Sequence, residues 1–321
     1  MTSAFQSLCY HYIRQESDDP LPRIFGTKIN NFIDHVKMIQ KKYNIISLDE
    51  IDSIYKNKNQ LTNEKNGLFF TFDDGLADQF EAAKILCENG ISGIFFIPTC
   101  TLIDKLPANP IILHYAIAIH GLDKFLTELK TYFEKHNVSE KSFFTQQTSK
   151  TKKFQTIDKI KDILYYKINH SLSRKILLDI YENLILSEKI SNSDMHFSIN
   201  QVKKLLDMGH KIGTHSHSHI SIGSSKLSKP EFQIEMIKPK ELLEKTFQTE
   251  VISMSYPFGE RKDCYDSGKL LAKTKSYKFA FTIEHKLNTI NTLPLEIGRY
   301  MVHSSDDASK LDKILEMKDR I

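Results

Sequence analysis

Two neighbouring carboxylates, Asp73 and Asp74, stand between an apolar run and Gly75. The run, residues 68–72, has the length and aromatic content of a buried strand. Carboxylates at the end of a buried strand are costly to desolvate unless a metal, a base partner or a substrate compensates them. Gly75 permits a sharp turn that can direct both acids into one cavity. On their own, these residues fit a solvated Asp-Asp-Gly turn equally well.

Three histidines, His215, His217 and His219, follow a second predicted strand. His215 and His219 are four residues apart, so one turn of helix-like backbone would place both imidazoles on the same side. Two histidines and a carboxylate are an ordinary ligand set for Zn²⁺ or a related divalent ion, with positions left open for water. A histidine-rich loop alone is more often a polar surface. Parallel sheets, however, place their sites at C-terminal strand ends, where the two carboxylates also lie, so the combination predicts a metal site.

Two further segments could complete this site. Residues 256–259, Tyr-Pro-Phe-Gly, follow a predicted strand, and such a tight turn can present a backbone N–H to a substrate oxygen. Arg299 belongs to the predicted last strand, residues 295–302, and offers a fixed positive charge that could pair with an active-site carboxylate. A surface salt bridge of Arg299 fits the sequence equally well.

The elements that must position these residues alternate between strands and helices, which indicates βαβ units and a parallel sheet. The predicted strands are residues 7–13 (with His11 inside), 43–46, 68–72, 93–98, 211–214, 251–256, 278–283 and 295–302. The predicted helices that alternate with them are residues 28–42, a short one after the N-cap Ser47, 77–89, 199–208, 230–247, 266–275 and 306–317. Residues 57–67 are polar and predicted to be a loop.

Residues 101–195 interrupt the alternation with helical patterns and no strand-like run. The predicted helices are residues 111–119, 122–133, 157–169 and 173–187, with a polar run at 139–153. We interpret residues 101–195 as a helical insertion at the ligand-facing end of one α/β unit made of residues 1–100 and 196–321. A structural cap or an oligomer contact is one hypothesis for its role, and a lid or an acceptor-binding surface is the other.

Composition and charge narrow the class of protein. A chain of 321 residues with 40% hydrophobic and 26% charged residues is long enough for one large α/β domain or two smaller ones. The net charge of +4 gives no argument for nucleic acid, although it is compatible with an anionic glycan, a phosphate or a lipid headgroup. The four cysteines lack paired spacing and indicate reduced thiols.

Signal sequences and membrane-spanning runs indicate where in the cell a protein is found. Residues 1–15 lack the pattern of a secretory signal, and no apolar run of about 18 or more residues is present to span a bilayer. We therefore expect a cytoplasmic protein, with contact to a membrane surface as an option, unless a signal has been removed. No pattern in the sequence specifies an oligomeric state.

Three motifs, residues 71–75, 215–219 and 256–259, resemble in this order those of the polysaccharide deacetylases, carbohydrate esterase family four or the nodulation-protein homology domain. Residues 10–12, Tyr-His-Tyr, are similar to the start of many members. The resemblance extends from Leu68 to about Val302, and the first two motifs are specific in combination. The third is looser, because the family often has an arginine where Ser255 stands. The resemblance implies a distorted (β/α) barrel.

The resemblance also implies roles for individual residues. Asp74, His215 and His219 would hold one divalent ion, zinc first and cobalt, nickel or manganese as alternatives. Asp73 would be the general base acting on a metal-bound water, since a coordinated carboxylate is a poor base. The backbone N–H of Phe258 would stabilise the oxyanion.

The general acid is where the sequence departs from the family, whose late Leu-x-His motif has no clean copy here. His303, just past the last predicted strand, and His11 are candidates, and return of the proton by Asp73 itself is the third option. The residues expected beside the substrate are Tyr256, Pro257 and His217. For His217, support of its own loop is the alternative.

The function implied is metal-dependent removal of an N-acyl group, in the first place acetyl, from an amino sugar in a glycan or a glycan precursor. A nucleotide- or lipid-linked intermediate of lipopolysaccharide or capsule assembly fits a cytoplasmic or membrane-surface location. Deformylation of a lipid-linked amino sugar is a close variant. The alternatives from other classes are a non-catalytic carbohydrate-binding protein on the same scaffold and hydrolysis of a cyclic imide or a purine-ring amide.

Overall fold

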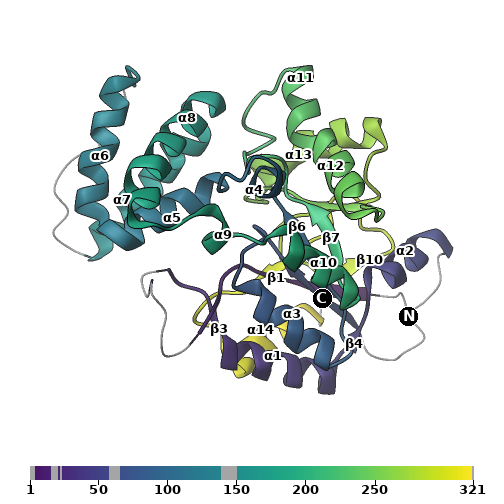
Figure 1. Ribbon diagram of the computed structural model, residues 1–321. Helices are drawn as coiled ribbons and strands as arrows, with labels where there is room; N and C mark the ends of the chain where they lie inside the picture. Colours follow the sequence, from purple (N-terminus) through teal and green to yellow (C-terminus); the bar gives the residue numbers. More distant parts are fainter. Residues whose placement is uncertain (1–3, 16–20, 22–23, 58–65, 139–149, 320–321) are drawn as a thin grey trace.

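The computed structural model describes residues 4–15, 21, 24–57, 66–138 and 150–319 (Figure 1). They form a nine-stranded sheet in which β10, β1, β5, β6, β7, β8 and β9 are neighbours in this order, while β11 pairs with β1 and β4 with β5. Every pairing in this sheet is parallel except that of β1 with β10. The bounds are β1 Ala4–Tyr10, β4 Asn44–Ile45, β5 Gly67–Phe72, β6 Gly93–Ile97, β7 Lys211–Thr214, β8 Ser253–Ser255, β9 Phe279–Phe281, β10 Asn288–Thr289 and β11 Tyr300–Met301.

The sheet curls into a distorted barrel because the chain between β10 and β11 connects its two ends. Ile297 forms a parallel bridge with Phe281 of β9, and β11 pairs with β1 at the other end. A second, two-stranded sheet joins β2 (Ile13–Arg14) to β3 (Thr27–Lys28). Residues 297–301 therefore contact both ends of the main sheet.

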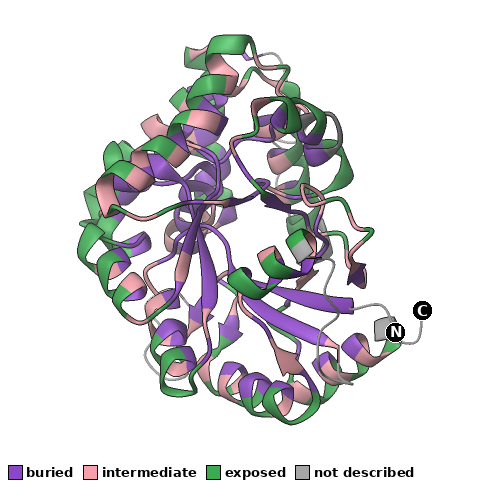
Figure 2. Cartoon of the chain, turned by 90° about the vertical axis from the view of Figure 1, so that its right-hand side faces the viewer, coloured by how far each residue is buried: buried purple, intermediate pink, exposed green. Residues whose placement is uncertain are grey.

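Helices surround the sheet and leave its central strands buried, as Figure 2 shows by their purple colour. All six residues of β5 are buried, which is typical of a parallel strand covered on both faces. The rings of Phe72 and Phe95 stack at 4.5 Å between centroids in this core. The helices are α1 Ile29–Lys42, α2 Leu48–Asn57, α3 Gln79–Glu88, α10 Ile199–Asp207, α11 Lys229–Phe232, η4 Gln233–Ile237, α12 Lys238–Phe247, α13 Arg261–Thr274 and α14 Ala308–Asp319.

The described residues between 108 and 195 are mostly helical, and α5, α6, α7 and α8 gather at one side of the barrel, whereas α4 lies beside β6 (Figure 1). They share a hydrophobic cluster that also includes Tyr12, Ile24 and Leu76. Backbone bonds join the end of this segment to the loop after β5, through Ala77 N–H to the Met195 carbonyl and Phe197 N–H to the Gly75 carbonyl, both at 2.9 Å. The elements are α4 Thr99–Ile103, α5 Asn109–His120, α6 Leu122–Lys135, α7 Lys150–Asp162, η1 Ile163–Lys167, α8 His170–Ile180, η2 Tyr181–Ile185, η3 Leu186–Glu188 and α9 Asn192–Met195.

Most predicted elements are present, with shifted ends. The N-cap at Ser47 is confirmed: its hydroxyl accepts from Glu50 N–H, and the Glu50 carboxylate accepts from Ser47 N–H. The first strand ends at Tyr10, so the prediction that His11 lies inside it is wrong. Helix α13 begins five residues before the predicted start, because Glu260 and Asp263 form a capping box.

The predicted strand at 295–302 is reduced to β11, and the two-residue β10 was not predicted. Two polar segments were predicted as loops or linkers, and their residues 58–65 and 139–149 lie outside the described part of the chain, while α7 begins at Lys150. Within the described ranges, every helix is too short or too polar to cross a lipid bilayer.

Replacing Phe95 with alanine tests the stacked core. Phe95 is fully buried against Phe72, Phe197 and His210, so we expect Phe95→Ala to lower the free energy of unfolding by about 3–5 kcal/mol. Denaturant unfolding followed by circular dichroism measures the change. The matched control is Phe25→Ala, because Phe25 is 68% exposed and its loss should cost less than about 0.5 kcal/mol. Equal losses for the two variants would contradict this packing.

Candidate functional site

Asp73 and Asp74 leave the end of β5 in an unusual backbone conformation. Asp73 N–H donates to the Tyr10 carbonyl at 2.9 Å, which continues the pairing of β5 with β1. Asp74 and Gly75 then have φ of +73° and +56°. A left-handed aspartate is strained, and such strain persists where the surroundings over-determine it. Here the ring of His196 supplies that support, with Nδ1 3.0 Å from the Asp74 carbonyl oxygen.

The histidine loop follows β7 directly. The described loop 215–219 is not helical, so the helix-like turn expected from the spacing is wrong; positive φ at Ser216 (+58°) and His219 (+61°) folds it back instead. His215 Nδ1 lies 2.9 Å from the Ser255 carbonyl oxygen, which leaves Nε2 directed at Asp74. The Glu235 carboxylate accepts from the N–H groups of residues 217 and 218 at 3.1 and 3.0 Å and so fixes the loop.

Asp74, His215 and His219 come together as the sequence predicts. Asp74 Oδ1 lies 3.4 Å from His215 Nε2 and 3.1 Å from His219 Nε2, and all three residues are buried. Nitrogen and oxygen ligands of a tetrahedral zinc ion lie about 3.4 Å apart, from the usual bond lengths. Asp74 Oδ1 is also buried and has no hydrogen-bond partner among the described residues, which is costly unless something else compensates it. The donor set therefore fits one divalent ion.

The pKa of Asp74 lies well below its usual range. Burial on its own would raise that pKa, but the imidazoles of His219 and His215 outweigh it. The carboxylate is thus ionised, as a metal ligand must be.

Asp73 is paired quite differently from its neighbour. Arg299 binds it with two parallel bonds, Nη1 to Oδ1 and Nη2 to Oδ2, both at 2.7 Å. Ser255 Oγ donates to Oδ2 at 2.9 Å. Burial raises the pKa of Asp73, but the Arg299 guanidinium and then His215 outweigh it and hold that pKa far below the ordinary value. Asp73 is therefore a fixed, ionised carboxylate.

Arg299 is fully buried, so the interpretation as a surface salt bridge is wrong. Besides Asp73, its guanidinium donates to Thr71 Oγ1 at 2.9 Å, to the Thr282 carbonyl at 2.9 Å and to Ser255 Oγ at 2.7 Å. The small side chain of Ser255 leaves room for the guanidinium. The positive charge beside Asp73 thus comes from the segment that closes the barrel.

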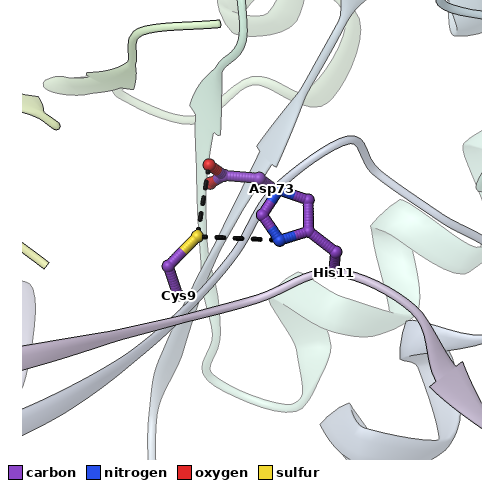
Figure 3. Close-up of side chains that lie close together, drawn as sticks. All are labelled: Cys9, His11 and Asp73. Atoms are coloured by element: carbon purple, nitrogen blue, oxygen red, sulfur yellow. Dashed lines mark hydrogen bonds between the residues drawn. The ribbon is translucent and has the colours of Figure 1, made fainter. Parts of the chain in front are cut away.

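A cysteine that was not predicted also contacts Asp73. Cys9 Sγ donates to Asp73 Oδ2 at 3.4 Å and lies 4.0 Å from His11 Nδ1, so that the thiol stands between carboxylate and imidazole (Figure 3). His11 is half-buried just past β1. Cys9 and His11 are two residues apart, the spacing that puts side chains on the same face of a strand, and this signal was available in the sequence.

Other predicted site residues lie elsewhere. His303 is exposed, and its ring lies 6.1 Å from that of Tyr300. His217 Nε2 pairs with Asp104 at 2.9 Å and its Nδ1 lies 3.0 Å from Thr99 Oγ1, so it ties its loop to α4. Tyr256 is 1% exposed and donates to the Leu295 carbonyl at 3.1 Å. Because Tyr256 packs into the core, its side chain is unavailable to a substrate, which corrects that prediction.

The turn after β8 brings Phe258 to the histidines. Phe258 has φ of +63°, and its ring lies 4.7 Å from that of His219. Pro257, beside it, is buried. Tyr165 and Tyr166 of η1 pack on the same ring at 4.9 and 5.8 Å. The helical segment therefore reaches the metal-ligand set through Phe258.

A small pocket opens at this junction. It is lined by Asn109, Leu164, Tyr165, His170, Ser173, His219, Ile220, Ser221, Ser225 and Phe258. Tyr165 Oη and Ser173 Oγ are buried there, and neither has a hydrogen-bond partner in the part of the chain that the structure describes. Burial raises the pKa of Tyr165, so its hydroxyl stays protonated and can donate to a ligand. No spacing in the sequence could indicate these two residues, because their position depends on how the helical segment packs.

His196 makes the support of Asp74 dependent on pH. Its Nε2 accepts from Ala108 N–H at 3.2 Å, so the ring is neutral, and burial lowers its pKa to about 4. An unfolded chain takes up this proton near pH 6.5, so the contribution of His196 is fully present above that pH and is lost as the pH falls towards 4. At pH 5 the loss is about 2 kcal/mol.

Denaturant unfolding at pH 7.5 and pH 5 tests this coupling. We expect His196→Gln, which keeps an amide donor but cannot titrate, to lose about 2 kcal/mol less between the two pH values than the wild type. The same loss in both proteins would show that His196 does not titrate in this way.

Part of the site lies in a stretch of the chain that matches a known protein family. A family model described as polysaccharide deacetylase matches residues 120–278. This stretch contains the histidine loop and the turn at Phe258 but not Asp73 and Asp74. No curated protein matches the chain.

Solved structures resemble the chain over nearly its whole length. The deacetylase PplD of Streptococcus pyogenes, solved in complex with acetate, is 13% identical, with 98% of this chain and 99% of that chain covered and a TM-score of 0.59. A de-N-acetylase from Aggregatibacter actinomycetemcomitans is 14% identical over 97% and 100%, with a TM-score of 0.57. IcaB from Ammonifex degensii is 12% identical over 97% of both chains, at 0.56. At such identities the likeness shows the fold, and the predicted deacetylase-type α/β architecture is confirmed.

Proposed function

We propose that the chain, whose residues 120–278 match the polysaccharide deacetylase model, acts as a member of that family and hydrolyses the N-acetyl amide of an amino sugar in a glycan or glycan precursor. The observation that supports this most strongly is the contrast between two adjacent carboxylates. Asp74 faces two imidazoles, whereas Asp73 is bound to a guanidinium. A protein that only binds a sugar has no need for a second ionised carboxylate beside the metal-ligand set.

Asp74, His215 and His219 would hold one divalent ion, for which zinc suits the two nitrogens and one oxygen. When bound, such an ion acts as a Lewis acid that lowers the pKa of water and polarises a carbonyl oxygen. The bond from His215 Nδ1 to the Ser255 carbonyl orients the ring and leaves Nε2 free as the ligand atom.

Asp73 would accept the proton of the attacking water. Arg299 and Ser255 hold its carboxylate in one orientation, and Oδ2 lies 4.0 Å from His215 Nε2, at the edge of the ligand set. Because its pKa is low, Asp73 is ionised at any ordinary pH and can accept a proton. For the same reason it is a weak base, and it holds the proton only briefly. As the C–N bond breaks, the water oxygen stays on the acyl carbon and the amine leaves protonated.

For the proton given to the amine, the structure supports His11 over His303. His11 contributes to the electrostatics of both Asp73 and Asp74, whereas His303 is exposed and bonded through its backbone to Asp306. We propose His11 as the general acid, with return of the proton by Asp73 as the remaining option. Arg299 acts through Asp73 and is a positioning residue.

Phe258 N–H is the proposed donor to the oxyanion. In the described part of the chain this N–H has no backbone partner, and the positive φ of Phe258 turns the peptide at the histidine loop. Preorganised donors of this kind stabilise charge that develops in the transition state.

Two variants, Asp73→Asn and His215→Ala, separate the role of the base from that of the metal ligands. We expect Asp73→Asn to keep about one metal ion per chain and to lose at least 100-fold in turnover, because the base is gone while the ligands remain. His215→Ala should lose the ion held by Asp74 and His219, and with it the activity. Elemental analysis gives the metal content, and acetate release from N-acetylated amino-sugar oligomers and nucleotide sugars gives the activity.

Other outcomes of this experiment count against the proposal. Metal without acetate release from any substrate of the panel would reject the acetyl group and direct attention to formylated or lipid-linked amino sugars. Absence of metal from the reconstituted wild type would remove the mechanism and favour the carbohydrate-binding protein. Unchanged turnover in Asp73→Asn would show that Asp73 is not the base.

Tyr165 tests whether the helical segment 101–195 lines the substrate site. We expect Tyr165→Phe to lower kcat/KM about 10-fold, since one hydrogen bond to the substrate is worth about 1–1.5 kcal/mol. The matched control is Tyr166→Phe, because Tyr166 packs on the same Phe258 ring but its hydroxyl is bonded to Asp263. Steady-state kinetics of both variants decide the matter: equal effects would exclude a specific role for the Tyr165 hydroxyl.

A further inference from the structure

A second group of metal-ligating side chains shares Asp73 with the proposed active site. Cys9, His11 and Asp73 each direct a ligand atom into one small volume, with these atoms within 4.8 Å of one another (Figure 3). We propose that they form a second divalent-cation site for thiophilic ions, and that its occupation inhibits the hydrolysis proposed above. The inhibition rests on the proposed function, whereas the binding of the ion does not.

The distances fit a tetrahedral ion. Zinc–sulfur bonds of about 2.3 Å and zinc–nitrogen or zinc–oxygen bonds of about 2.0–2.2 Å place sulfur about 3.6 Å from either of the other ligand atoms. Cys9 Sγ lies 3.4 Å from Asp73 Oδ2 and 4.0 Å from His11 Nδ1, one distance slightly shorter and the other slightly longer. Side-chain shifts of a few tenths of an ångström would bring the three atoms around one ion.

The chemistry of the donors distinguishes this site from the first. One thiolate, one imidazole and one carboxylate select zinc, cadmium or another soft ion over magnesium or calcium. Binding breaks the S–H bond of Cys9, releases its proton to solvent and forms a sulfur–metal bond. Asp73 Oδ2 then gives a lone pair to the ion in place of accepting the thiol proton.

The surroundings make this site the weaker one. Burial raises the pKa of the Cys9 thiol, and the guanidinium of Arg299 lies 2.7 Å from the same Asp73 oxygen, where it repels a cation. The thiolate and carboxylate charges outnumber that of Arg299, but deprotonating a buried thiol remains costly. We therefore expect the site to fill after the ligand set of Asp74, His215 and His219 is occupied.

Occupation would remove the two groups that move protons in the proposed reaction. A carboxylate bound to a metal is a poor base, and an imidazole bound to a metal cannot donate a proton. Activity should therefore rise with the first equivalent of zinc and fall with the second.

Cadmium titration of the full metal-free protein tests the site without any substrate. Isothermal calorimetry and elemental analysis should give two equivalents in the wild type, the second accompanied by thiolate-to-metal absorption in the ultraviolet. Cys9→Ser should bind one equivalent without this absorption. The matched control Cys100→Ser, which changes another fully buried cysteine, should still bind two. His11→Ala should weaken the second equivalent and provides a check should Cys9→Ser fail to fold.

Two results would overturn the proposal: a single equivalent in the wild type, or a second equivalent that persists unchanged in Cys9→Ser. His215→Ala separates this test from the proposed function, because it should lose the first equivalent and keep the one with thiolate absorption. Acetate release at one and at three equivalents of zinc gives the inhibition ratio for the wild type and for Cys9→Ser. We expect that ratio to be at least 10-fold larger in the wild type than in Cys9→Ser; equal ratios would reject the inhibition.

Discussion

The buried ion pair of Arg299 with Asp73 is the interaction on which the site depends. A carboxylate with only 2% of its surface exposed would be driven to protonate by burial alone. The bidentate guanidinium reverses that tendency, and loss of one partner of such a pair typically costs about 3–5 kcal/mol. Arg299 lies between Ile297 and β11, which contact opposite ends of the sheet. The segment that closes the barrel therefore also supplies the guanidinium that keeps Asp73 ionised.

The site also depends on strained backbone that other parts of the chain hold in place. Asp74, Ser216, His219 and Phe258 all have positive φ, and all four border the proposed metal and substrate positions. Strain of this kind persists only where the surroundings over-determine it. His196 bonds to Asp74, and Glu235 binds the histidine loop, so that residues far apart in the sequence hold the ligands in place.

The sequence predicts the strand ends and the residues placed on them well, because apolar runs followed by polar residues mark where parallel strands stop. Asp74, His215 and His219 are brought together on that basis. Their orientation could not be predicted, since a spacing of four residues suggests a helical turn and the actual loop reverses through left-handed residues. The burial of Arg299 depends on how the sheet closes, and the position of Tyr165 depends on the packing of the helical segment. Neither the burial of Arg299 nor the position of Tyr165 is marked by a local pattern in the sequence.

Ser255, at a position where the family that this chain resembles often has an arginine, shows the same limit. From the sequence, the serine only makes the third motif a looser match to the family. In the fold, Ser255 and Arg299 both contact Asp73, and the guanidinium occupies space that a larger residue at position 255 would take. The positive charge beside Asp73 comes from Arg299, just before β11, and only the three-dimensional contacts reveal this.

A crystal structure of the protein loaded with one equivalent of zinc, with anomalous data collected at the zinc edge, tests the central claim most directly. We predict an anomalous peak bound by Asp74, His215 Nε2 and His219 Nε2, while Asp73 stays outside the coordination sphere and keeps both bonds to Arg299. A zinc ion bound by Asp73, with Arg299 displaced from Asp73, would contradict the assignment of Asp74 as metal ligand and Asp73 as base.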